Sequence, residues 1–173
     1  MMISQALLSQ AEVNELLETY PLGACWNASH YLGSMFVLDF GDRLLVNRAR
    51  GSVFVGTASI SVRDVFWSLS RQGQRLATAD EIDHTRFGDV LLPALVGTAL
   101  ESIESLAERK AKAFHFSGSV ELVVDTADIW KSNDVLVEVT LLTGKYLRLM
   151  PGGLWTSSGD RDLLRKQSFE RRS

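Results

Sequence analysis

The sequence predicts an α+β fold, built mostly from antiparallel β-sheet with about two helices packed on one face. Two observations lead to this prediction. Apolar side chains alternate at every second position along short stretches separated by glycine-containing turns, a pattern typical of β-hairpins. The same order of elements, a capped helix, a strand and two hairpins, also recurs in both halves of the chain, which indicates an internal duplication.

The hairpin pattern is clearest over residues 112–125, KAFHFSGSVELVVD, where alternating apolar residues flank a Ser-Gly-Ser turn. A similar pattern covers residues 35–46, MFVLDFGDRLLV, and there Gly41 and Asp42 are expected to form the turn. The inward-facing residues of both hairpins are expected to form the core: Phe36, Leu38, Phe40, Phe114, Phe116, Leu122 and Val124. His115 has the opposite phase and is expected to face solvent.

A helix is expected at the start of each half. Ser9 with Glu12, and Thr78 with Glu81, match the pattern of a capping box. The first helix is predicted over residues 1–20. It ends before Pro21, because the residue preceding a proline is disfavoured in the helical conformation.

The second helical region is predicted from residue 78 to about 94, with a break at Gly88 and an end at Pro93. Two interpretations compete for residues 95–109. Apolar residues spaced by three and four favour a continued helix, whereas the duplication favours a strand over 97–104, matching 23–30. We follow the apolar spacing and expect helix, with a strand as the alternative.

The remaining elements complete a single α+β domain over residues 1–157, with pseudo-repeats at about 9–77 and 78–157. Strands are expected in the first half at 23–30, 35–40, 43–47, 52–60, 62–69 and 74–77, and in the second at 112–116, 120–125, 135–142 and 145–149. The strand 52–60 is interpreted as an insertion. Ser157-Ser158-Gly159 is expected to be a linker, leading into a polar tail over 158–173.

Composition limits the class of protein. The chain has 173 residues, enough to bury a substantial core, and its 46% hydrophobic and 23% charged residues are ordinary for a globular protein. A net charge of −3 does not favour nucleic acid as a partner. No apolar run reaches the roughly 18–20 residues of a membrane span. A single cysteine and the lack of a secretory signal pattern fit a cytoplasmic protein.

Candidate catalytic groups have ordinary structural interpretations. Cys25 and His30 are five residues apart, so on a strand they would point to opposite faces, and Cys25 is expected to be a core residue. The histidines His30, His84 and His115 are isolated in sequence, so no metal site is predicted.

The pair Asp39 and Asp42 is assigned to the expected hairpin turn, where aspartate commonly bonds local backbone. Gly152-Gly153 has no helix behind it and so lacks the geometry of a phosphate-binding loop. We therefore predict no catalytic residue, no cofactor and no metal site, and the sequence leans toward a non-enzymatic protein.

Two features point to a partner. Seven acidic residues against one arginine give residues 78–108 a local net charge of −6, with Asp80, Glu81, Asp83 and Asp89 closest together. Trp26 and Trp67 are expected in the core, but Trp130 lies in a polar loop. It either anchors an interface or packs on its own domain. We assign Asp80, Glu81, Asp83, Asp89 and Trp130 as candidate partner-binding residues.

The repeated pattern F-x-F-x-G-x-x-x-L-x-V, followed by a tryptophan loop and a strand–Gly–strand, is similar to small bacterial immunity-type proteins of polymorphic toxin systems. It also resembles uncharacterised families of the same β-rich build. The resemblance covers roughly residues 97–149 and, more faintly, 23–76. It implies a cytoplasmic protein that binds and neutralises a cognate toxin, and it carries over no catalytic residues. The acidic segment could then face a basic, nuclease-like surface.

Two alternatives remain open. One is a small-molecule-binding or enzymatic β-rich domain with its ligand between the two halves, which a deep apolar cavity lined by several polar groups would favour. The other is a homodimer that forms through an exposed strand such as 52–60. A flat acidic face would favour the toxin-binding hypothesis.

Overall fold

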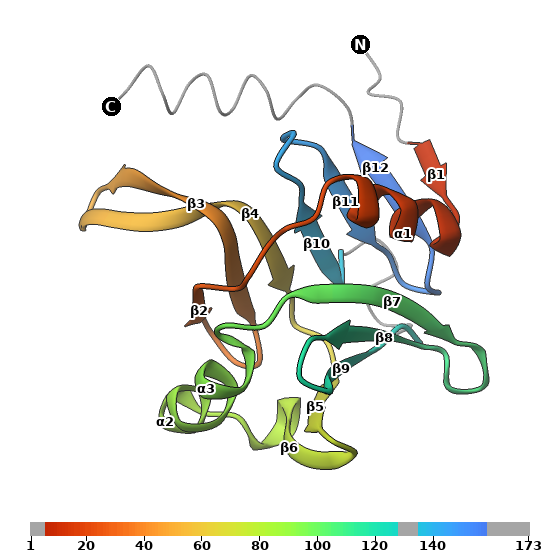
Figure 1. The fold of residues 1–173 in the computed structure, drawn as a ribbon. Coiled ribbons are helices and arrows are strands. Elements are labelled where there is room, and N and C mark those ends of the chain that lie inside the picture. Colours follow the sequence, from red (N-terminus) through yellow and green to blue (C-terminus); the bar gives the residue numbers. More distant parts are fainter. Residues whose placement is uncertain (1–5, 128–134, 159–173) are drawn as a thin grey trace.

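The structure is a computed structural model that describes residues 6–127 and 135–158, and it contains two antiparallel sheets (Figure 1). The predicted α+β class is confirmed. The strands are β1 (Ala6–Leu8), β2 (Asn27–His30), β3 (Phe36–Arg48), β4 (Gly51–Val62), β5 (Trp67–Arg71), β6 (Gln74–Thr78), β7 (Leu100–Leu106), β8 (Ala111–Phe116), β9 (Val120–Asp125), β10 (Val137–Thr140), β11 (Tyr146–Leu149) and β12 (Trp155–Ser158). The helical segments are α1 (Gln10–Thr19), η1 (Ala79–Glu81), α2 (His84–Arg86), η2 (Phe87–Leu91), α3 (Leu92–Leu95) and η3 (Ala107–Arg109).

The two halves of the chain exchange hairpins. The seven-stranded sheet has the order β1-β12-β11-β10-β4-β3-β2, and the five-stranded sheet has the order β6-β5-β9-β8-β7. The meander β2–β3–β4 of the first half therefore pairs with the hairpin β10–β11 of the second. The meander β7–β8–β9 of the second half pairs with the hairpin β5–β6 of the first. Both pseudo-repeats thus have the same strand order, and each sheet contains strands from both.

The helices are exchanged in the same way. Helix α1 of the first half packs on β7, where the Asn14 side-chain amide donates to the Ile103 carbonyl (2.8 Å) and accepts from its N–H (3.0 Å). Helix α3 of the second half packs on β2. Each helix thus covers the first meander strand of the other half.

The halves meet at a short backbone bridge. The Cys25 N–H donates to the Thr98 carbonyl and the Gly97 N–H donates to the Cys25 carbonyl, both at 2.7 Å. Ala24 and Ala99 form the β-bridge between these bonds. The segments that lead into β2 and β7, the first meander strands of the two halves, therefore lie beside each other.

The expected hairpin over residues 35–46 is wrong. Strand β3 continues through Gly41 and Asp42 with a bulge between Phe40 and Arg43, and the turn lies at residues 49–50. Gly41 has φ +71°, and a Cβ at this position would collide with the Thr57 side chain. A glycine in this conformation is typical of a bulge as well as of a turn. Strand β4 is consequently no insertion, because it corresponds to β9.

Residues 100–106 are strand, so the duplication predicts this region correctly and the apolar spacing does not. Helix α3 ends at Leu95, because Val96 is already extended (ψ 129°). Strand β7 then pairs with β8 from Leu100 to Leu106. Segment 78–95 is helical as expected, but it consists of short 3₁₀, α and π turns, with Gly88 inside the π turn.

The two predicted capping boxes have different outcomes. At Ser9 the box is present, since its hydroxyl accepts from the Glu12 N–H (3.1 Å) and the Glu12 carboxylate accepts from the Ser9 N–H (3.4 Å). The helix begins only at Gln10, because residues 6–8 pair with β12 instead. Thr78 makes no side-chain cap bond. At the other end of the chain, Ser157 and Ser158 belong to β12 and are no linker.

The buried side chains of both sheets form one hydrophobic cluster. All seven residues predicted from the alternation are at most 1% exposed. Trp67 is buried as predicted and packs edge-on against Phe36, with 5.2 Å between ring centroids. Trp26 is only partly buried, with the Arg43 guanidinium above its ring.

Phe116→Ala tests this core. Removal of a fully buried phenylalanine loses its transfer free energy and leaves a cavity, so we expect a loss of about 3–5 kcal/mol of unfolding free energy. Urea denaturation of both proteins measures it. An unchanged midpoint would show that the buried face of β8 is misassigned.

Candidate binding sites

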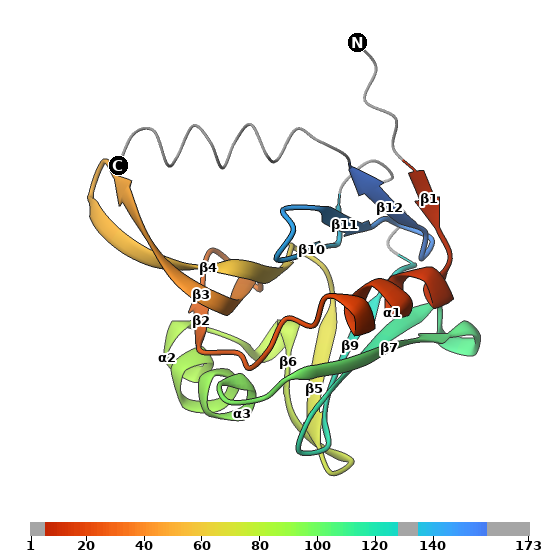
Figure 2. The same ribbon diagram turned by 45° about the horizontal axis from the view of Figure 1, so that its top comes forward.

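A group of exposed apolar side chains lies on an extension of the β3–β4 hairpin, residues 43–56, which we call the arm. Strand β2 pairs only with Phe36–Asp39, and β10 pairs only with Ser59–Val62. Beyond these residues β3 and β4 pair with each other alone, and both edges of the ribbon are open. Figures 1 and 2 show the arm projecting from the body of the molecule.

Both faces of the arm are apolar. Leu45 and Phe54 are cross-strand partners on one face, and they are 55% and 57% exposed. The opposite face carries two further cross-strand pairs, Leu44 with Val55 and Val46 with Val53. A two-stranded ribbon with no core behind it is marginally stable in water, and exposed apolar patches mark interaction sites.

A groove of about 510 Å³ lies where the arm meets the seven-stranded sheet. The arm contributes an apolar wall that includes Val46 and Val53, and the sheet side contributes Tyr31 and Tyr146. Val37, Ser59 and Thr140 line its floor and alternate with core residues, so the groove lies on the sheet face that points away from the core.

Asp39 holds the base of the arm. This side chain is buried, and its two carboxylate oxygens accept from the Asn27 amide and from the Gly56 N–H, both at 3.0 Å. The interpretation of Asp39 as a hairpin-turn residue is therefore wrong. A side chain at Gly56 would collide with the backbone of Phe40 and Ala58, so this glycine allows β4 to pass close to the bulge.

The four acids of the proposed partner surface all lie exposed in segment 79–91. The Glu81 carboxylate pairs with Arg75 (3.3 Å), and Asp83 accepts from the Arg86 N–H (2.7 Å) as the cap of α2. The other acids of the −6 stretch lie apart from them on β7 and η3, where Glu104 pairs with the solvent-facing His115. Trp130 lies outside the described residues.

Segment 79–91 packs on the other face of β2 from the groove, where His30 pairs with the core residue Phe36. Tyr31 of the groove follows His30, whose Nδ1 lies 3.2 Å from the Nδ1 of His84. His30 also donates from Nε2 to the Gly33 carbonyl (2.6 Å) and stacks on Phe87. Since side chains alternate along a strand, His30 and Tyr31 point to opposite faces, and the acidic segment lies away from the groove.

Cys25 is a core residue, as the sequence predicts. The side chain is 1% exposed and its thiol donates to the Asn27 carbonyl (3.3 Å), while His30 contacts His84. Burial raises the pKa of Cys25 from 9.0 to about 11, and the nearby Asp39 carboxylate adds to the rise. A thiol with a raised pKa is a poor nucleophile at neutral pH.

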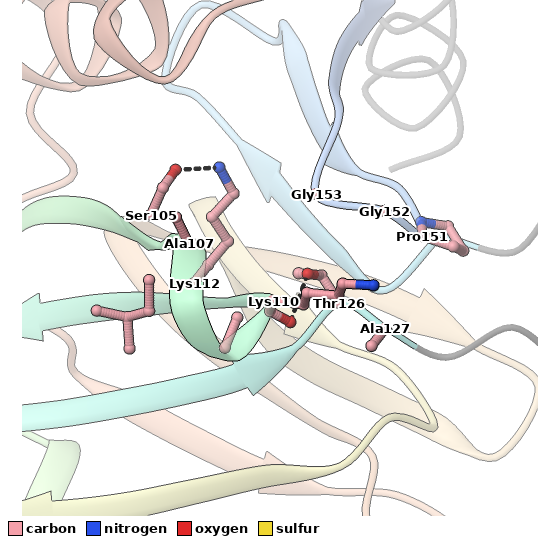
Figure 3. Close-up of a pocket in the computed structure, with 11 residues that line it drawn as sticks. Ser105, Ala107, Lys110, Lys112, Thr126, Ala127, Pro151, Gly152 and Gly153 are labelled. Carbon is pink, nitrogen blue, oxygen red and sulfur yellow. Dashed lines mark hydrogen bonds between the residues drawn. The ribbon is translucent and has the colours of Figure 1, made fainter.

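Sequence reasoning missed one residue with unusual chemistry, Lys112. This lysine shares its phase on β8 with Phe114 and Phe116, so the alternation already placed it on the core-facing side. Its side chain is 6% exposed and lines a second pocket, of about 620 Å³ (Figure 3).

Among the described residues, no group of three or more His, Cys, Asp or Glu side chains could hold a metal ion. No helix in the described ranges is long and apolar enough to cross a membrane. Comparisons with protein-family models, curated proteins and solved structures find no match to this chain.

The Cys25 thiol should react slowly with iodoacetamide in the folded protein. At about pH 8 its raised pKa lowers the thiolate fraction by about 100-fold relative to an ordinary cysteine, and burial slows access further. The raised pKa also contributes stability that is present below about pH 9 and is lost as pH rises toward about 11. Mass spectrometry of native and urea-unfolded protein measures the rates, and equal rates would contradict the burial of Cys25.

Proposed function

We propose that this chain is a non-enzymatic protein-binding module of the immunity type, which neutralises a cognate toxin protein. The observation that carries the proposal is the arm, whose apolar side chains face solvent on both sides. A catalytic role finds less support, because the Cys25 thiol and the Asp39 carboxylate are both buried and hydrogen-bonded.

A protein is the occupant that best fits the arm. A small ligand in the groove would contact the side of the arm that carries Leu44 and Val46, and Leu45 would remain exposed on the other side. A protein can cover both faces. It can also add a strand to the open edge of β3 or β4, where unpaired backbone groups are available.

The arm and the acidic segment carry charges of opposite sign. The arm carries Arg43, Arg48 and Arg50 and no acidic residue, whereas segment 79–91 carries four acids against Arg86. The acidic segment packs on the core-facing side of β2, opposite the groove. We place Asp80, Glu81, Asp83 and Asp89 at the rim, where charges mainly steer association, and we keep Trp130 as a candidate anchor.

The arm is tested with the cognate partner, identified by co-purification from the native host. The double variant Leu45→Ser/Phe54→Ser should weaken binding by about 2 kcal/mol or more, as for hot-spot residues, mostly through faster dissociation. Leu154→Ser is the matched control, because Leu154 is 59% exposed on the turn between β11 and β12. Equal binding by the double variant and the wild type would contradict the proposal, as would recovery of no protein partner.

The rim is tested by charge reversal at Asp80 and Asp89. These two sites are preferred because Asp83 caps α2, so its replacement would also perturb folding. Asp80→Lys/Asp89→Lys should slow association at low salt and flatten its salt dependence, with little change in unfolding free energy. Unchanged association rates at low and high salt would remove the acidic segment from the interface.

A further inference from the structure

Lys112 is a buried cation that has no acidic partner among the described residues. Its ammonium donates to the Gln10 amide oxygen (2.8 Å) and to the Ser105 hydroxyl (2.6 Å), which are neutral acceptors. No carboxylate of the described residues forms an ion pair with it, and burial lowers its pKa below the ordinary 10.5. Burial of an unpaired charge is costly, so buried cations usually have an anionic partner.

The duplication shows that the fold does not require a cation at this position. In the seven-stranded sheet, Phe36 pairs with Val62, which in turn pairs with Val137. In the five-stranded sheet, Lys112 pairs with Val124, which in turn pairs with Trp67.

Val137 and Trp67 are equivalent positions in the two halves. Each residue begins the first strand of its hairpin, Val137 in β10 and Trp67 in β5. Each also follows an Asp-Val step in the sequence, at residues 134–135 and 64–65 respectively. Lys112 therefore occupies the position that the other half fills with the buried Phe36. A phenylalanine satisfies the packing there, so the lysine has another role.

The pocket beside Lys112 lies between the ends of the two sheets. One wall comes from the end of β7, η3 and the start of β8, and the other comes from the turn Pro151–Gly153 that precedes β12 (Figure 3). Lys110 and Lys112 are the ionisable residues among its described lining, which contains no acid.

Hydrogen bonds hold the pocket in shape. The Thr126 N–H and hydroxyl both donate to the Lys110 carbonyl (2.9 and 2.7 Å), and the Gly152 N–H donates to the Thr126 carbonyl (2.7 Å). Gly153 has φ +84°, a conformation that favours glycine, and it lies against the Lys112 and Thr126 side chains. An ammonium has three N–H donors, and two of those on Lys112 are used, so one remains for a ligand.

We propose that this pocket binds a small anionic ligand through a carboxylate or phosphate group, with Lys112 as its principal counter-charge and Lys110 as a second. The β7–β8 turn, whose residues line the pocket, lies at the side of the molecule away from the arm (Figures 1 and 2), so this site is separate from the protein-binding surface. It also lies between the two sheets rather than between the two pseudo-repeats, where the sequence hypothesis put a ligand.

The test uses the full chain without an affinity tag, with inorganic phosphate and succinate as probes at ionic strength matched by sodium chloride. Either or both probes should raise the thermal unfolding midpoint and give a saturable titration by calorimetry. Lys112→Met should weaken binding by about tenfold or more, as expected for loss of a charge-assisted hydrogen bond, and Lys110→Met should weaken it less. Lys145→Met is the control, because Lys145 is exposed and lies outside the pocket.

Two results would overturn the proposal. One is a wild-type protein that responds to neither probe beyond the chloride control, and the other is a Lys112→Met variant that binds as well as the wild type. If Lys112→Met does not fold, the lysine ¹³Cε resonances of the wild type decide the question. A saturable shift of the Lys112 signal on addition of the bound probe supports the site, and an unchanged signal contradicts it.

Discussion

The structure depends on the exchange of secondary structure between its two halves. Strand β4 pairs with β10 of the second half, strand β5 pairs with β9, and helices α1 and α3 pack on the first meander strand of the opposite half. Neither sheet can therefore be completed by one half alone, and the side chains of both sheets share one core. The backbone bridge between Cys25 and Thr98 joins the segment that leads into β2 to the segment that leads into β7.

Against this shared plan, the differences between the halves indicate where function lies. Strands β3 and β4 have 13 and 12 residues, whereas their counterparts β8 and β9 have 6 each. The extra length forms the arm, which the fold does not need, since the second half closes its sheet without one. Lys112 is the second difference, because it replaces a core phenylalanine of the other half. We therefore place both proposed sites at positions where the two halves differ.

Much of the fold follows from local patterns in the sequence, and the misassignments have identifiable causes. Alternation finds the core phenylalanines, because one face of each sheet is buried. Gly41 is assigned to a hairpin turn from the sequence, but a glycine with positive φ is typical of a bulge as well as of a turn. The apolar spacing over 95–109 is assigned to a helix, but it fits a strand as readily. The exchange of hairpins is invisible to local reasoning, because strands paired across the halves lie far apart in the chain. The arm is missed for a related reason: Leu44, Val46 and Val53 alternate in the same way whether or not anything packs on them. Lys112 could have been found, because it lies two residues before Phe114 and therefore on the same, core-facing side of β8.

The exchange is tested most directly by cutting the chain between residues 78 and 79, after β6, and producing the two halves separately. Each half contains a meander and a hairpin that are not paired with each other in the folded protein. We expect each half alone to show non-cooperative unfolding and poorly dispersed amide resonances. An equimolar mixture should form a one-to-one complex with the cooperative urea transition and amide spectrum of the intact chain. A half that folds cooperatively as a monomer by itself would contradict the account.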